Sequence, residues 1–131
     1  MLTKADHIEY WIKSSKDDWK TVESLFTGKR YLHSSFFAHL TVEKLCKAMW
    51  VKNNEDNFPP RIHHLVKLIQ QSNIDLNQDQ LLFLQSFNDF QIEGRYPDYL
   101  FKIDKICTFG FTKDTLKTVS EIIKCLQEKL P

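Results

Sequence analysis

The segment from Tyr31 to Val51, YLHSSFFAHLTVEKLCKAMWV, constrains the fold of this chain more than any other feature. It contains no glycine or proline, and its apolar side chains point in nearly every direction around a helix. A helix that is apolar almost all round is a buried helix. Serine, histidine, glutamate and lysine side chains interrupt the apolar run too often for it to cross a bilayer. We therefore expect the central helix of a small domain, with the other segments packed around it.

Helical patterns flank this segment on both sides and predict an all-α fold. Residues 4–27 repeat apolar side chains at helical spacing, after a Thr3–Asp6 capping box and before a helix-ending Gly28. Further helices are expected over residues 61–71, after two prolines, and over residues 78–94, after Asn77. The sequence therefore predicts a single domain over residues 1–131, an up-and-down bundle of about four to five helices.

The C-terminal third is predicted to begin with an irregular segment. Residues 95–111 are rich in aromatic and basic side chains, and Pro97 and Gly110 interrupt them. Long loops in compact domains are often functional. Thr112 is expected to cap a last helix that continues to about Leu130.

Composition bears on the partners of the protein, its redox environment and its location. The formal net charge of +1 gives no global field for nucleic acid or an acidic membrane. The three cysteines form no CxxC pair, which suits free thiols in a reducing cytoplasm. No targeting or membrane-spanning segment is visible, so we expect a cytoplasmic location and no membrane partner. Ten Phe, four Tyr and three Trp exceed what one small core needs, which indicates a homodimer interface.

Charged residues inside the central helix are the first candidates for a site. Glu43 and Lys47 have the spacing of an ion pair on one helix face, and an unpaired buried charge is costly. They therefore form either a structural pair or part of a site. His39 and Glu43 are also one turn apart, as metal ligands can be, but no third ligand has a matching spacing. We expect a buried polar pair and no metal or cofactor.

Two further groups of residues are candidates for binding phosphate. His63 and His64 are neighbours on a predicted helix, so at most one should face the bundle. His64 could bind phosphate, or it could only form a hydrogen bond between helices. Arg95 and Tyr96 follow a helix end, and arginine with tyrosine is typical of sites for phosphates and unpaired bases. An Arg95–Asp98 ion pair that only pins the loop is the alternative.

Three stretches in this order resemble the HEPN family, the "higher eukaryotes and prokaryotes nucleotide-binding" domains. They are SSFFAHLTVEKLCKAMWV, PPRIHHLVKL and GRYPD, which together lie within residues 34–98. The resemblance implies a helical bundle that dimerises and is often encoded beside a minimal nucleotidyltransferase, as in toxin–antitoxin pairs. It also implies that active members are metal-independent ribonucleases with an arginine followed, after four to six residues, by a histidine.

The ribonuclease spacing is absent from this chain. Its only arginines are Arg30, Arg61 and Arg95, and none has a histidine at that distance. No catalytic residue is therefore predicted.

The leading hypothesis is a non-catalytic HEPN-type module that binds a nucleotide, RNA or a partner nucleotidyltransferase. Its cleft is expected between the central helix and the loop after the fourth helix, lined by Glu43, Lys47, His64, Arg95 and Tyr96. One alternative is a toxin-like ribonuclease that uses Arg95 with His64 or His63. The other is a structural adaptor whose buried polar residues only set the helix register.

Overall fold

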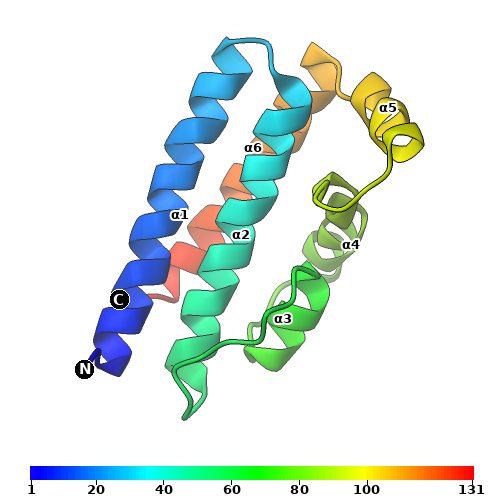
Figure 1. Cartoon of the computed structure of the whole chain (residues 1–131). Helices are drawn as coiled ribbons and strands as arrows, with labels where there is room; N and C mark the ends of the chain where they lie inside the picture. Colours follow the sequence, from blue (N-terminus) through cyan, green and yellow to red (C-terminus); the bar gives the residue numbers. More distant parts are fainter.

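A computed structural model describes residues 1–131 as six α-helices and one short 3₁₀ helix, with no strands. The all-α prediction is confirmed. Three long helices, α1, α2 and α6, run side by side, and the short α3 and α4 lie on the far side of α2 from α1 (Figure 1). The helices in chain order are α1 (Lys4–Thr27), α2 (Tyr31–Asn53), α3 (Leu65–Gln71), α4 (Gln78–Phe87), η1 (Asn88–Phe90), α5 (Pro97–Ile106) and α6 (Phe109–Glu128).

Helix α2 is the centre of the bundle. Its Ala38, Val42 and Leu45 side chains are fully buried, and no other helix contributes as many buried residues. Val22 of α1, Leu65 of α3 and Leu126 of α6 join the same core cluster. The central position predicted for residues 31–51 is therefore correct.

The connection between α1 and α2 is short and makes the two helices antiparallel neighbours. The capping box is formed, because Thr3 Oγ1 accepts from the Asp6 N–H and Asp6 accepts from the Thr3 N–H. Gly28 is the C-cap at φ −77°, whereas the next residue, Lys29, takes the left-handed conformation at φ 61°. The chain therefore reverses at a lysine rather than at the glycine.

The third helix starts later than predicted, at Leu65 rather than residue 61. The chain stays irregular through His64, a stretch in which His63 bonds to Glu43 of α2 and the Leu65 N–H donates to Asn88 Oδ1. His64 then caps α3, since its Nδ1 accepts from the Lys67 N–H at 3.3 Å.

The fourth helix ends earlier than predicted, at Phe87, and continues only as the 3₁₀ turn to Phe90. The expected end near Gly94 is wrong. The physical reason lies at Asn88, whose Oδ1 accepts from the Leu65 N–H at 3.1 Å. This contact with the start of α3 holds Asn88 where α4 ends. Gly94 instead lies in a turn at φ 75°.

Residues 95–111 are largely helical, which corrects the prediction of an irregular segment. Pro97 occupies the first turn of α5, where its fixed φ suits a helix, and Ile103 is buried below it. Thr108, not Thr112, is the N-cap of α6, because its Oγ1 accepts from the Phe111 N–H. Thr112 lies buried inside α6. The bundle therefore has six α-helices instead of four or five.

No helix in the structure combines the length and the hydropathy that a bilayer span needs.

Candidate functional site

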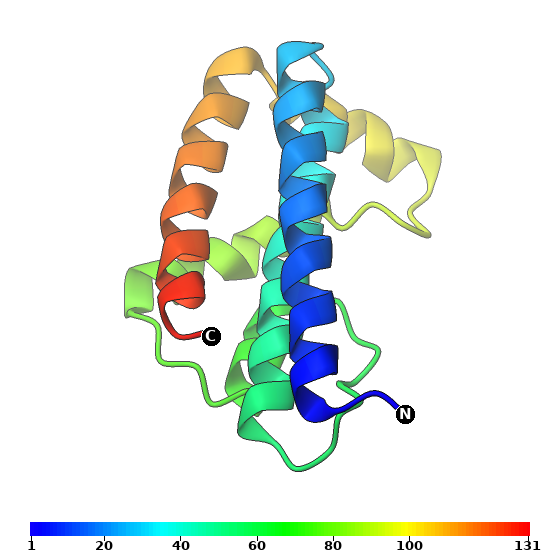
Figure 2. The ribbon, with the colours of Figure 1, turned by 90° about the vertical axis from the view of Figure 1, so that its left-hand side faces the viewer.

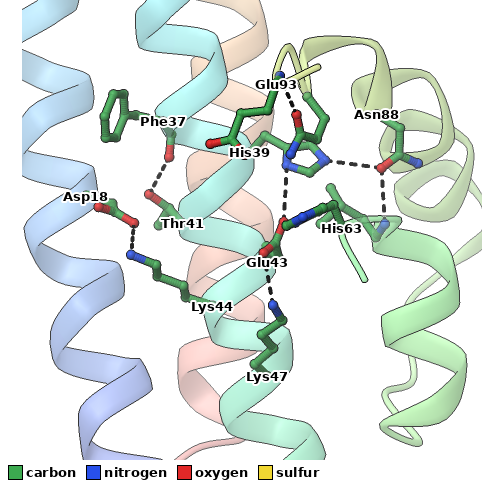
Figure 3. A network of polar contacts seen from close by, with 12 residues as sticks. Asp18, Phe37, His39, Thr41, Glu43, Lys44, Lys47, His63, Asn88 and Glu93 are labelled. Atoms are coloured by element: carbon green, nitrogen blue, oxygen red, sulfur yellow. Dashed lines mark hydrogen bonds and ion pairs between the residues drawn. The ribbon is translucent and has the colours of Figure 1, made fainter. Parts of the chain in front are cut away.

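A buried carboxylate, Glu43, connects α2 to the segment that leads into α3. The residue is 3 % exposed, and its Oε2 accepts from the Lys47 ammonium at 3.1 Å. Its Oε1 accepts from His63 Nδ1 at 3.0 Å (Figure 3). The predicted Glu43–Lys47 pair is therefore present, and a histidine completes it from outside the helix.

His39 joins the same network from the next turn of α2. Its Nε2 lies 3.1 Å from Asn88 Oδ1, which also accepts from the Leu65 N–H, so His39 is the donor (Figure 3). Burial is the main cause that lowers the pKa of His39, while Asn88 and Glu43 oppose it. The imidazole is therefore neutral at pH 7. Its Nδ1 lies 3.8 Å from Glu43 Oε1 and has no hydrogen-bond partner.

These contacts tie three separate parts of the chain together. Glu43 holds the segment before α3 through His63, and His39 holds η1 through Asn88. No group of three or more histidine, cysteine, aspartate or glutamate side chains is placed to hold a metal ion. The buried network therefore aligns helices and orients His63.

The network opens to the surface at a cleft lined by His63, His64, Asn88, Gln91 and Arg95, which we call the Arg95 cleft. Its inner part encloses about 150 Å³. A shallower depression of about 590 Å³ adjoins it, where His63, Gln91 and Arg95 again contribute, beside Glu93 and Gly94. His63 has a side chain that is 51 % exposed. Because its Nδ1 donates to Glu43, its Nε2 is free for a ligand.

Arg95 presents most of its guanidinium to solvent. Its Nε donates to the Gln91 carbonyl at 3.2 Å, and its guanidinium carbon lies 4.5 Å from the Tyr99 ring centroid. Tyr99 is held in turn, because its hydroxyl donates to the Asp89 carbonyl at 2.8 Å. No ion pair joins Arg95 to any carboxylate, so the predicted Arg95–Asp98 alternative is not present. The two terminal nitrogens of the guanidinium can bind a bidentate anion.

The structure brings only part of the predicted set of site residues together. Arg95 and His64 line the same cleft, although His64 Nδ1 is already occupied, because it accepts from the Lys67 N–H and caps α3. Glu43 lies behind His63 and Lys47 one turn further along α2, where its ammonium is 5.5 Å from the Trp11 ring. Tyr96 is 80 % exposed at the start of α5 and does not line the cleft. The cleft is therefore lined by residues that pack on α2, and no residue of α2 itself lines it.

Sequence reasoning missed Asn88 and Gln91 and gave His63 only as an alternative to His64. The pair of adjacent histidines signalled that one of them faces inward, but not which one. Asn88 carried no signal of its own, because an asparagine near a helix end usually serves only as a cap or turn residue.

Comparison with known proteins gives one match, to the family described as HEPN domain, over residues 8–130. No curated protein and no solved structure matches the chain.

Proposed function

The chain belongs to the HEPN domain family, and from this premise we propose that it is a non-catalytic module that binds a nucleotide through its phosphate in the Arg95 cleft. Family membership supports a nucleotide-binding or ribonuclease-like module in general. The choice of the cleft rests on the residues that line it.

The observation that supports phosphate binding is the convergence of His63, His64 and Arg95 on one cleft. Arg95 offers two terminal guanidinium nitrogens, and His64, whose Nδ1 accepts from the Lys67 N–H, offers Nε2–H. Gln91 accepts the Glu93 N–H with its Oε1, which leaves its amide NH₂ as a further donor. Charge-assisted donors grouped in this way are typical of phosphate sites.

A non-catalytic role follows from the spacing of the basic residues. The family's ribonuclease pattern of arginine and histidine is absent, as no arginine here has a histidine four to six residues later. His64, which the alternative paired with Arg95, accepts the Lys67 N–H through Nδ1 and closes the end of α3.

The second candidate, a metal-independent ribonuclease, is favoured by one contact. The buried Glu43 carboxylate orients the exposed imidazole of His63 at 3.0 Å, and such a carboxylate–histidine pair can act as a general base. In this candidate His63, rather than His64, removes the proton from the RNA 2′-hydroxyl, and Arg95 stabilises the phosphate.

Isothermal titration of the protein with ATP, AMP and inorganic phosphate tests the first proposal. We expect weak binding that declines as salt rises, because screening weakens contacts between exposed charges. No heat at millimolar ligand would rule out nucleotide binding and leave the ribonuclease, the adaptor and the partner-binding roles. A fluorogenic RNA substrate in the same buffer tests the second candidate. Cleavage that disappears in His63→Ala would replace the non-catalytic reading.

We further propose that the module forms a homodimer and pairs with a minimal nucleotidyltransferase in a toxin–antitoxin-like system. The class of partner is what the resemblance to HEPN domains implies. Exposed large apolar side chains on α5 and the start of α6 support an interface between copies of the chain; they are Tyr96, Phe101, Ile106, Phe109 and Phe111.

A further inference from the structure

A second surface feature, a groove between α1 and α6, lies away from the Arg95 cleft. Figure 2 shows α1 and α6 side by side with α2 behind them. One depression of about 410 Å³ lies between them, with Lys16, Trp19 and Lys20 of α1 on one wall, Ile123 and Lys124 of α6 on the other, and Thr41 of α2 below. We call it, with its continuation below, the α1–α6 groove.

The groove continues toward the N-terminal end of α1. A second depression of about 630 Å³ shares Lys16 with the first and is lined by Ala5, Ile8, Ile12 and Pro131. The lining residues of α1 thus extend from Ala5 to Glu23. This stretch is about 27 Å long at the helical rise per residue. A surface helix of comparable length therefore fits alongside it.

The lining combines an apolar strip with unpaired positive charge. The half-buried Ile12 and Trp19 supply apolar surface over the nearly buried Ile8 and Ile123, and Lys16, Lys20 and Lys124 stand beside it. None of these three ammonium groups has a hydrogen-bonded or ionic partner within the chain, unlike Lys44 and Lys47. Glu9 and Glu23 are the only acidic residues in the lining. The charge therefore complements an acidic occupant.

The hydroxyl groups of the groove argue against a small anion as the occupant. Those of Ser15, Thr41 and Ser120 donate to the carbonyls of their own helices, at 2.6, 2.9 and 2.8 Å. No hydroxyl donor is left, and the exposed lysines do not form a fixed cradle. An apolar strip with a charged rim is instead the composition of a protein interface.

We propose that the α1–α6 groove docks an amphipathic helix of a partner protein, with acidic residues flanking its apolar face. The apolar face would cover Ile8, Ile12, Trp19 and Ile123, and carboxylates at its edges would pair with Lys16, Lys20 and Lys124. Such a helix completes a bundle with α1, α2 and α6, as helix-in-groove complexes do. The groove shares no lining residue with the Arg95 cleft, so substitutions in one leave the lining of the other unchanged.

The test uses a synthetic helical peptide of about 18 residues, which spans about 27 Å. It carries leucine at i, i+3, i+4 and i+7 spacing with glutamate at both edges, and a fluorophore for anisotropy. We expect binding to the unmodified protein and a loss of about tenfold or more with Lys16→Glu, Lys20→Glu and Lys124→Glu combined. A peptide with lysine in place of glutamate should bind that variant better than the unmodified protein.

The matched control reverses three exposed lysines elsewhere, Lys102→Glu, Lys105→Glu and Lys113→Glu, and should keep the affinity for the acidic peptide. Arg95→Ala should also keep it, which separates this proposal from nucleotide binding. Carbodiimide cross-linking of the unmodified protein should join peptide glutamates to Lys16, Lys20 or Lys124. No binding, equal losses in both triple variants, cross-links confined to lysines outside the groove, or preference for single-stranded RNA over the peptide at this groove would each overturn the proposal.

Discussion

At the scale of single residues, Glu43 and Lys47 occupy positions that a buried helix would otherwise fill with apolar side chains. Both are nearly inaccessible, at 3 % and 8 % exposed. Taking two charges out of water is costly, and their mutual attraction compensates only when both are present and well placed. The carboxylate has a second partner in His63, which makes it the residue on which the surrounding contacts depend.

Removing Lys47 should therefore destabilise the protein strongly. Lys47→Ala leaves the Glu43 carboxylate buried without its cation, and we expect the free energy of unfolding to fall by about 3 kcal/mol. Urea denaturation measures this loss, with Lys13→Ala on the exposed face of α1 as control, expected within about 0.5 kcal/mol. Equal midpoints for the two variants would show that the pair contributes little.

Arg95 should matter for ligand binding and hardly at all for stability. In the structure its side chain makes one hydrogen bond, to the Gln91 carbonyl, and stacks on Tyr99, without an ion pair. Arg95→Ala should abolish calorimetric ATP binding, while the melting temperature stays within a few degrees of the unmodified protein. Lys102→Ala serves as a charge-matched control on α5. A variant that melts much earlier but still binds ATP would assign Arg95 to loop structure instead.

The buried His39 should make stability depend on pH. Burial holds its pKa below the ordinary value of 6.5, so below that pH the unfolded chain binds a proton that the folded protein resists. The contribution of neutral His39 to the free energy of unfolding is therefore fully present above about pH 6.5, and it is lost as the pH falls below that value. Urea unfolding from about pH 7.5 to about pH 5.5 should show a larger loss for the unmodified protein than for His39→Gln. An equal loss in both would assign the pH dependence to other groups.

At the scale of elements, α2 is the helix on which the rest packs. Leu45 is fully buried in the main cluster, whereas Phe37 is only half-buried and packs against it from outside. The sequence alone did not distinguish these two residues, because both fall in the same apolar run.

Truncation of α2 should reflect this difference. Leu45→Ala should cost roughly 2–5 kcal/mol through lost burial and the cavity left behind. Phe37→Ala should cost less, since part of its ring already faces water. Chemical denaturation of both variants beside Lys13→Ala gives the comparison. If Leu45→Ala unfolds at the same denaturant concentration as Lys13→Ala, α2 is not the core.

At the scale of the whole molecule, large apolar side chains remain exposed at one end of the bundle, although Phe109 also contacts Phe26 and Phe111 contacts Phe90. Phe101 is 70 % exposed, Phe109 53 % and Phe111 41 %, on α5 and the first turn of α6. Clusters of exposed apolar residues commonly mark interaction surfaces. The aromatic surplus seen in the sequence therefore includes rings at the surface as well as in the core.

We expect the protein to be a homodimer in solution. An interface of standard size buries about 1,600 Å² in total. Light scattering at tens of micromolar should give twice the monomer mass, and the double variant Phe101→Ser with Phe109→Ser should give the monomer. Lys102→Ser is the control and should leave the dimer intact. A monomer mass for the unmodified protein would contradict the proposed assembly.

Local patterns in the sequence were enough to predict the helical class, the central place of α2 and the extent of α1. The capping box at Thr3 and the start of a helix after Asn77 were also correctly predicted. Each of these features depends on side chains within a few residues of one another, through helical spacing or an N-terminal cap. Such short-range interactions can be read directly from the order of residues.

Only the tertiary structure decided which residues meet. Glu43 and His63 are 20 positions apart, and His39 and Asn88 are 49 apart, so no local pattern connects them. The same distant contact to Asn88 fixes where α4 ends, and the buried Ile103 places α5 where a loop was expected. Contacts between remote segments depend on how the helices pack, and packing is settled by the whole core rather than by any one stretch of sequence.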